Sequence, residues 1–341
     1  MSGLQWAPLR CDNVCARSFA NGMAYAQDVA SITRVMDARD PSVVVCGVFD
    51  GIHVGHRRLL DDALAQARDA QVPCVVVTFD PDPSEVLGRD EDATRLLSCV
   101  DRVQGLLAMG VDVVLVFGFT HEFAALEPQQ FVHDRLLASV NPMSVFVGAN
   151  FRYGRGGSGD AALLERMGAR LGFSVVTHKL ERLDGKVVSA TRVRRLLAEG
   201  RLDEANALLG RCHYVRGVVE HGRGQGTGFG FPTANVACET NTCMPAEGVY
   251  ACYVICQDRA WPAAANVGAP PTFGKHKSLF LEATLVGFEG DLYGREVCVS
   301  FVAWLRASRS FSSVEELSEV VLGNIDWVRR NLGEGETEVM A

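Results

Sequence analysis

The sequence lacks a long hydrophobic run, and it has no excess of positive charge. Its 341 residues include 33 Lys and Arg against 41 Asp and Glu, which gives a net charge of −8. This acidic balance argues against a broad surface for nucleic acid or for an acidic membrane, although a small anion needs only a local basic pocket. The longest apolar stretch, residues 111–119, is far shorter than the ~18–20 residues of a membrane helix. We therefore expect neither a nucleic-acid partner nor a membrane partner.

Two further signatures are absent. The first residues lack the basic start and apolar block of a secretory signal, so we expect a cytoplasmic protein. None of the eleven cysteines belongs to a paired C-x-x-C array, which argues against a zinc site and indicates reduced thiols in the core. What is present is 48% hydrophobic content and enough chain for two domains with sizeable cores.

The first half of the chain alternates between strand-like and helix-like patterns. Short runs rich in valine are separated by longer stretches with helical periodicity, which is typical of βαβ units in a parallel sheet covered by helices. We therefore predict an α/β fold with a doubly wound parallel sheet. The expected strands are 42–49, 72–79, 111–119, 143–148 and 173–180, and the expected helices are 56–70 and 99–109.

The second half changes to closely spaced strands. A helix over 197–211, ending near Gly210, precedes the change, so we place the domain boundary near 212 and expect domains 1–211 and 212–341. Strands without intervening helices predict an antiparallel β-barrel, followed by an amphipathic terminal helix over 313–332 and a frayed end. The expected barrel strands are 213–222, 248–257, 279–288 and 295–306.

The stretch GVFDGIHVGH, residues 47–56, follows the first valine strand at the point where a turn feeds a helix. Free backbone N–H groups and the helix dipole favour a phosphate there, and glycines let the backbone approach it. The spacing fits neither the G-x-G-x-x-G fingerprint nor the P-loop, because two histidines replace the P-loop lysine. His53 and His56 are three residues apart at a helix start, so their imidazoles can donate hydrogen bonds to one phosphate.

This stretch resembles the G-x-F-D-G-x-H-x-G-H signature of Rossmann-like H-x-G-H nucleotidyltransferases, in the form carried by bacterial bifunctional riboflavin kinase/FMN adenylyltransferases. Further blocks match that family in order, with residues 77–87 similar to its flavin-side loop, 147–160 to its nucleotide-side loop and 187–197 to its S-S-T-x-I-R motif. The resemblance implies catalytic roles for His53, His56 and Arg194. It implies nucleotide-binding roles for Gly47, Phe49, Asp50, Gly51, Asn150, Ser189 and Thr191.

The barrel half contains HGRGQGTGFGFPTANV, residues 221–236. Its glycine-rich backbone, with Gly222, Gly224 and Gly228, can wrap phosphates through its amides. Thr233 and Asn235 offer oxygens on alternate positions of an extended segment, which suits Mg²⁺ held with ATP.

The string GFPTAN is similar to the riboflavin kinase signature. That resemblance implies that Glu282 is the general base on the flavin ribityl hydroxyl and that Phe231 and Arg306 contact ligand. The sequence thus predicts a two-step enzyme. Its barrel phosphorylates riboflavin with ATP and Mg²⁺ to give FMN, and its α/β domain adenylylates FMN to FAD with release of pyrophosphate.

Three alternatives stay open from the sequence, as does the oligomeric state. The chain could transfer a nucleotidyl group to another acceptor and carry an unrelated barrel. It could be a non-catalytic module built on an OB-like barrel. It could also have lost one of the two activities, since Ala190, Asp82 and Pro270 depart from the family pattern.

Overall fold

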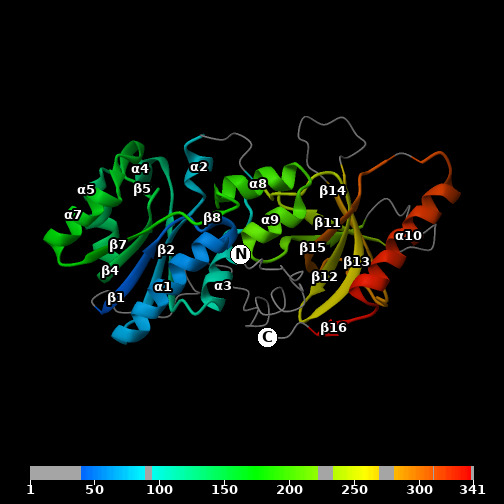
Figure 1. The fold of residues 1–341 in the computed structure, drawn as a ribbon, viewed down its shortest axis with the longest axis horizontal. Helices are drawn as coiled ribbons and strands as arrows, with labels where there is room; N and C mark the ends of the chain where they lie inside the picture. Colours follow the sequence, from blue (N-terminus) through cyan, green and yellow to red (C-terminus); the bar gives the residue numbers. More distant parts are fainter. Residues whose placement is uncertain (1–39, 89–93, 222–232, 269–279, 310, 339–341) are drawn as a thin grey trace, which may run out of the picture. The chain divides into compact units, whose positions relative to one another are not determined.

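The computed structural model describes residues 40–88, 94–221, 233–268, 280–309 and 311–338 (Figure 1). The chain forms two compact units that divide between Ala190 and Thr191. Within the described ranges, no helix combines the length and apolar character needed to cross a membrane.

The first unit contains a parallel sheet of five strands. The spatial order is β3-β2-β1-β4-β7, so the chain moves outward from β1 in one direction and then restarts on its other side. Such a reversal marks the switch point at which α/β sheets bind ligands. The predicted doubly wound sheet is confirmed, with strands β1 (Pro41–Cys46), β2 (Cys74–Asp80), β3 (Val113–Gly118), β4 (Asn141–Gly148) and β7 (Ser174–His178).

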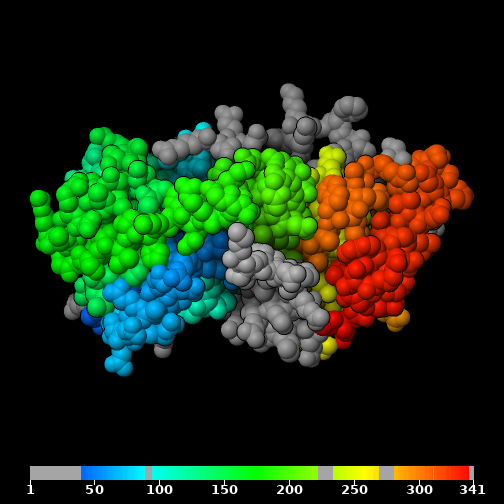
Figure 2. Space-filling view, viewed as in Figure 1, coloured from blue at the N-terminus to red at the C-terminus, as the bar shows by residue number. Residues whose placement is uncertain are grey.

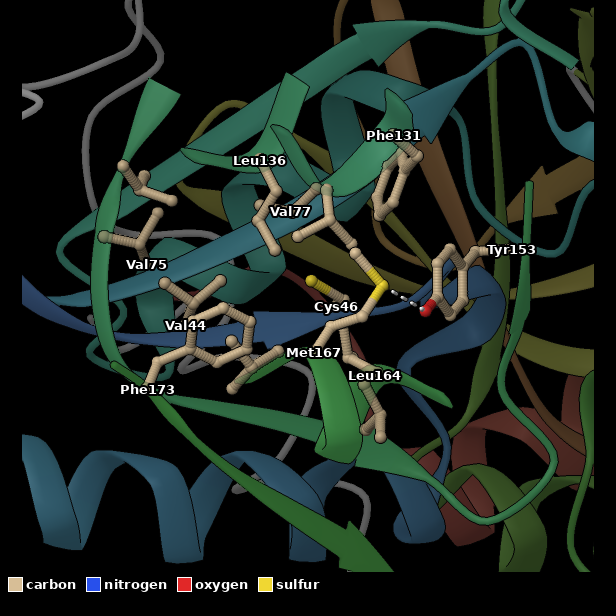
Figure 3. Packing of buried hydrophobic residues seen from close by; sticks show 14 of the residues in the cluster. Val44, Cys46, Val75, Val77, Phe131, Leu136, Tyr153, Leu164, Met167 and Phe173 are labelled. Carbon is tan, nitrogen blue, oxygen red and sulfur yellow. Dashed lines mark hydrogen bonds between the residues drawn. The ribbon is translucent and has the colours of Figure 1, made fainter. Parts of the chain in front are cut away.

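The sheet is buried on both faces, which explains its uninterrupted valine runs. On one face Val44, Val75 and their neighbours pack against Leu164 and Met167 of α7 (Ala161–Leu171). Figure 3 shows this core, in which the Tyr153 hydroxyl lies 3.9 Å from the Met167 sulfur. The opposite face also carries fully buried valines, and α1 (Val54–Ala70) packs against β1 and β4.

The remaining elements of this unit are short, apart from α3 (Cys99–Ala108). The others are α2 (Pro83–Val86), α4 (His121–Ala124), α5 (Pro128–Gln130), a π-helical turn at Phe131–Leu136, α6 (Leu137–Ser139), 3-10 turns at Asp50–Ile52 and Arg155–Gly157, and the small pairs β5 (Arg152–Tyr153) with β6 (Gly159–Asp160) and β8 (Arg182–Leu183) with β9 (Lys186–Val187).

Two helices, α8 (Ala190–Ala198) and α9 (Leu202–Leu209), precede the barrel. The prediction of one helix over 197–211 is wrong, because Gly200 adopts a left-handed conformation with φ 73° and interrupts it. The predicted end is correct: Gly210 caps α9 with φ 66°.

Six antiparallel strands then close into a barrel, as predicted. Their order is β12-β15-β10-β11-β14-β13, and β13 pairs back to β12. The prediction omitted β13, whose alanines and Pro262 are poor strand formers, and it gave β11 only as an extended segment around Thr233 and Asn235. The strands are β10 (His213–Glu220), β11 (Thr233–Cys238), β12 (Gly248–Cys256), β13 (Arg259–Gly268), β14 (Phe280–Leu285) and β15 (Glu296–Arg306).

The terminal helix α10 (Val314–Leu332) agrees with its prediction and lies on the outside of the barrel (Figure 2). Its buried side chains Ile325 and Val328 pack on Ala251 and Ala264 of the strands. The chain after it is not frayed throughout, because β16 (Thr337–Glu338) pairs with β13.

Most of the cysteines follow the prediction of reduced core thiols. Eight described cysteines are free, and burial raises the pKa of Cys46 and Cys74 to about 12. The prediction is wrong for Cys212, whose sulfur is in a disulfide bond. Spacing along the chain does not reveal which sulfurs a fold brings within bonding distance.

Candidate active sites

The turn at residues 47–56, called the anion turn below, has an unusual backbone. Phe49 and Ile52 adopt φ values of 59° and 41°, and Gly51 between them has φ 77°. Left-handed backbone costs on the order of 1–3 kcal/mol for bulky residues and is found mainly where a functional geometry requires it. The turn is therefore a strained segment that the surrounding unit must hold in place.

Asp50 is the main anchor of the anion turn. Its buried carboxylate accepts hydrogen bonds from the backbone N–H groups of Leu96, at 3.0 and 3.2 Å, and of Leu97, at 3.1 Å. Phe49 is fully buried, and a Cβ at Gly47 would lie 3.0 Å from its ring. Burial and these hydrogen bonds offset the backbone strain, so Asp50 and Phe49 are structural parts of the turn.

The two predicted imidazoles lie against each other. Their ring centroids are 3.6 Å apart and the planes differ by 11°. His53 is the N-cap of α1, where its Nδ1 accepts a hydrogen bond of 3.3 Å from the backbone N–H of His56. Because Nδ1 of His53 is an acceptor, its proton sits on Nε2, which is left as a donor.

Both imidazoles are neutral near pH 7. Burial lowers the pKa of His53 to about 4. Burial, followed by the charges of His53 and Arg102, lowers the pKa of His56 well below its ordinary value. Neutral rings keep one N–H each, so the pair can donate to phosphate oxygens without gaining or losing a proton.

Asn150 lies just after the carboxyl end of β4, the strand beside β1. It is therefore at the same carboxyl edge of the sheet as the anion turn. Its exposed side chain folds toward Gly148, where a Cβ would lie 3.1 Å from the Asn150 oxygen. The loop arginines bind their own chain: Arg152 donates to the Phe151 carbonyl, and Arg155 pairs with Glu127 at 2.6 Å.

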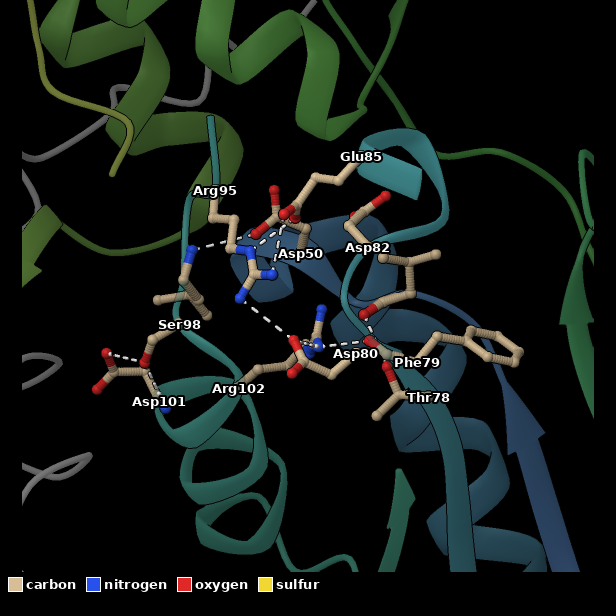
Figure 4. A network of polar contacts seen from close by, with 12 residues as sticks. Asp50, Thr78, Phe79, Asp80, Asp82, Glu85, Arg95, Ser98, Asp101 and Arg102 are labelled. Carbon is tan, nitrogen blue, oxygen red and sulfur yellow. Dashed lines mark hydrogen bonds and ion pairs between the residues drawn. The ribbon is translucent and has the colours of Figure 1, made fainter. Parts of the chain in front are cut away.

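The other neighbour of β1 is β2, and residues 80–87, called the acceptor segment below, continue from its end. Asp82 caps α2 by accepting hydrogen bonds from the N–H and hydroxyl of Ser84. Figure 4 shows that Arg95 reaches both Glu85 and Asp80 of this segment. No motif or spacing in the sequence indicates Arg95, because its ion pairs with Glu85 and Asp80 depend on local packing.

The S-S-T-like block lies at the start of α8. Thr191 is exposed in the first turn of that helix, Arg194 is partly exposed, and Arg195 pairs with Glu199 at 3.7 Å. Ser189 precedes the helix and belongs to the first unit.

The barrel brings three predicted residues together. The Thr233 hydroxyl donates a 2.5 Å hydrogen bond to Glu282, and Asn235 lies directly opposite Glu282 across β11 and β14. The alternate residues, such as Ala234 and Leu281, are buried. The three polar side chains therefore share the half-exposed face of these strands.

The same row extends to Asn266, which the sequence analysis did not single out. Asn266 is directly opposite Glu282 across β13 and β14, and the Ser308 hydroxyl lies 3.3 Å from its side-chain oxygen. The sequence did not indicate a role for Asn266, because β13 was not predicted as a strand. Arg306 is half-buried at the end of β15, where its guanidinium lies 5.6 Å from the centre of the Phe311 ring.

Part of the predicted kinase site lies outside the described residues, namely Gly222, Gly224, Gly228 and Phe231. Pro270 is outside them as well. Among the residues that are described, no group of three or more His, Cys, Asp or Glu is arranged to hold a metal ion.

Two family models match the chain, one on each half. The FAD synthetase model matches residues 35–192 and the riboflavin kinase model matches residues 209–332. The first match covers the parallel sheet with the anion turn, and the second covers the barrel with Thr233 and Glu282.

Curated relatives match both halves in one alignment. The bifunctional riboflavin kinase/FMN adenylyltransferase of Bacillus subtilis is 31% identical over 84% of this chain and 91% of the relative. The enzyme of the same name from Escherichia coli is 36% identical over 81% of this chain and 88% of the relative. A Streptococcus pneumoniae crystal structure, titled a macrolide-efflux protein, has a TM-score of 0.78 at 30% identity, covering 86% of this chain and 95% of that one.

Proposed function

The chain belongs to the family of bifunctional riboflavin kinase/FMN adenylyltransferases, and on this premise we propose which residues perform the two reactions. The protein phosphorylates riboflavin to FMN and adenylylates FMN to FAD. The observation that carries this function is the pair of family matches, each on the fold expected for its reaction. A nucleotidyltransferase with an unrelated barrel, or a non-catalytic module, does not agree with them.

For adenylylation, the phosphate oxygen of FMN attacks the α-phosphorus of ATP, and pyrophosphate leaves. His53 and His56 donate their N–H groups to phosphate oxygens as negative charge moves onto the leaving group. The stacked, neutral geometry supports this role, because donors that are already oriented need no rearrangement during the step. The strained backbone of the anion turn fixes the orientation of these two imidazoles.

The strand order of the sheet supports placing ATP and FMN on opposite sides of the anion turn. The anion turn follows the central strand β1, with Asn150 after β4 on one side and the acceptor segment after β2 on the other. We assign ATP to the Asn150 side, with Ser189 as a further nucleotide contact in the same unit. From the family resemblance we also propose a nucleotide contact for Thr191 and a catalytic role for Arg194, both at the start of the second unit. FMN then binds against the acceptor segment.

For phosphorylation, Glu282 takes the proton from the terminal ribityl hydroxyl of riboflavin as that oxygen attacks the γ-phosphorus of ATP, and ADP leaves. The half-exposed position of Glu282 beside Thr233 and Asn235 supports the assignment. Phe231 and Arg306 are assigned to ligand contacts, and Gly222, Gly224 and Gly228 to the phosphates.

The donor set beside Glu282 fits Mg²⁺. Thr233 and Asn235 present hard oxygen ligands on one face, and Mg²⁺ takes few protein oxygens while it keeps water and phosphate ligands. We assign the ion to these two residues. When bound, it neutralises charge on the ATP phosphates.

The functional boundary near 212 is part of the proposal. Residues 193–208 lie outside both family matches, and the compact units divide earlier, at Ala190 and Thr191. The cytoplasmic location expected from the sequence stays a prediction.

Two variants separate the half-reactions in the full chain. His56→Ala should lower FAD formation from supplied FMN by about 10²–10³-fold, because a transition-state donor is lost. Glu282→Ala should lower FMN formation from riboflavin by about 10²–10⁴-fold, because the general base is lost. Each variant should keep the other half-reaction, and flavins resolved by chromatography measure both.

The exposed residues His133 and Glu319 provide matched controls, since Glu319 lies in α10, away from the row of Asn235 and Glu282. His133→Ala and Glu319→Ala should keep both half-reactions at the parental rate. Parental FAD formation in His56→Ala would reject the imidazole assignment, and an undiminished kinase in Glu282→Ala would reject the base.

A further inference from the structure

We infer that Arg95 is a positioning residue of the adenylylation step: it fixes the acceptor segment, residues 80–87, in the conformation that FMN requires. The inference rests on the proposed binding of FMN against this segment. Arg95 would act through Glu85 and Asp80, without contact to the reacting atoms.

One guanidinium contacts the segment at two points, Asp80 and Glu85. Nε and Nη2 of Arg95 donate to the two oxygens of Glu85, at 2.6 and 2.9 Å, in a bidentate pair. Its Nη1 lies 3.2 Å from Oδ1 of Asp80, an ion-pair contact without hydrogen-bond geometry. Asp80 is the last residue of β2 and Glu85 belongs to α2, so Arg95 ties the start of the segment to its helical turn.

The ion pair between Arg95 and Glu85 is shielded from solvent. The side chains of Arg95 and Glu85 are only 19% and 23% exposed. A planar, bidentate pair with this shielding fixes both distance and direction, which a surface ion pair between flexible side chains does not.

The segment needs such support. Helix α2 has only four residues, and a single turn of helix is unstable by itself because its nucleation is unfavourable. The Asp82 cap stabilises the first turn, but Ser84, its partner, lies within the segment itself. Arg95 supplies a tie to another part of the fold.

That other part is the anchor of the anion turn. Arg95 directly precedes Leu96 and Leu97, whose N–H groups bind Asp50. The chain from Asp50 through Arg95 to Glu85 therefore links the turn that carries His53 and His56 to the segment that receives the acceptor (Figure 4). Such a link sets the position of the FMN phosphate relative to the imidazoles, and small misplacements of a reactant are costly.

The test is the kinetics of FAD formation from supplied FMN. Arg95→Gln should raise the KM for FMN by about tenfold or more and change the KM for ATP by less than about threefold, because the lost interaction affects acceptor binding. Glu85→Gln should give the same pattern, and riboflavin phosphorylation should be unchanged in both. Arg58→Gln is the matched control, since Arg58 is 63% exposed in the same unit, and it should leave both KM values unchanged.

Rescue and coupling distinguish positioning from a general loss of stability. Arg95→Lys keeps the positive charge but cannot form the bidentate hydrogen bonds of a guanidinium. Its KM for FMN should therefore fall between those of the parent and Arg95→Gln. The double variant Arg95→Gln/Glu85→Gln should be no worse than the worse single variant, because Arg95→Gln already removes the ion pair that Glu85→Gln removes.

Equal rises in the KM values for ATP and FMN would overturn the inference, as would an unchanged KM for FMN in an active Arg95→Gln protein. If Arg95→Gln does not fold, Glu85→Gln and Arg95→Lys decide by the same criteria. A parental protein that makes no FAD from FMN would instead reject the proposed function.

Discussion

His213 is a buried histidine that the proposed chemistry does not use. Its side chain is 1% exposed, its ring stacks on Phe301, and its Nε2 lies 2.8 Å from the Cys243 carbonyl oxygen. Nε2–H is therefore the donor and Nδ1 carries no proton. Burial, followed by the charge of Arg211, lowers the pKa of His213 to about 3.

This pKa predicts a pH dependence of barrel stability. Above pH 6.5, the ordinary histidine pKa, the ring is neutral whether the chain is folded or unfolded, and the stability is fully present. As the pH falls from 6.5 toward 3, the unfolded chain binds a proton that the fold rejects, so the free energy of unfolding decreases. Urea unfolding at several pH values, followed by tryptophan fluorescence, measures the slope, since Trp261, Trp304 and Trp327 all lie in the barrel unit.

The variant His213→Gln keeps a donor for Cys243 without a group that titrates, so its unfolding free energy should fall less between pH 6.5 and 5. The exposed His133 is the control, and His133→Gln should keep the parental slope. Equal slopes for parent and His213→Gln would contradict the assignment.

At the residue scale, the sequence identified groups whose role is local. His53 and His56 could be recognised because they are three residues apart at the start of one helix, a spacing that brings their rings together. Glu282 and Thr233 came from family blocks, and their contact needed the strand register. Arg95 and Asn266 could not be found, because packing and strand register set their contacts with Glu85 and Glu282, and no motif or spacing reveals them.

At the element scale, replacing glycine by alanine should have opposite effects on stability at two positions. Gly217 lies in β10, where a Cβ would meet the carbonyl of Ala237 and lie 2.7 Å from the Val236 side chain. Gly323 is exposed within α10, and a Cβ there meets nothing within 4 Å.

Gly217→Ala should destabilise the barrel by about 1–3 kcal/mol, because a neighbouring backbone yields poorly to overpacking. Gly323→Ala should stabilise it by about 0.5–1 kcal/mol, because alanine loses less conformational freedom in a helix. The urea midpoint of tryptophan fluorescence measures both. A stabilising Gly217→Ala would show that the two strands separate more easily than their packing indicates.

Elements with strong patterns were predictable, and elements without them were not. The valine runs of β1 and β2 are buried on both faces and read clearly in the sequence. Strand β13 carries alanines and Pro262, yet it forms because β12 and β14 pair with it on either side. Gly200 could have been read as a helix break, but a glycine inside a helical pattern is also tolerated at modest cost.

At the scale of the whole molecule, two units of different architecture serve two transfers at phosphorus. The parallel sheet presents a turn at its switch point, and the barrel presents a row of oxygen donors on one face of its strands. Fold class and order of the units followed from the change of periodicity along the chain, since parallel and antiparallel sheets impose different patterns. The division at Ala190 did not follow, because α8 and α9 read as a continuation of the first half.

The most direct measurement is the conversion of riboflavin by the purified full chain with ATP and Mg²⁺, with the flavins resolved over time. FMN should form first and then decline as FAD accumulates, with pyrophosphate released in step with FAD. Recovery of unchanged riboflavin, or FMN that never gives FAD, would contradict the account of one chain that performs both reactions.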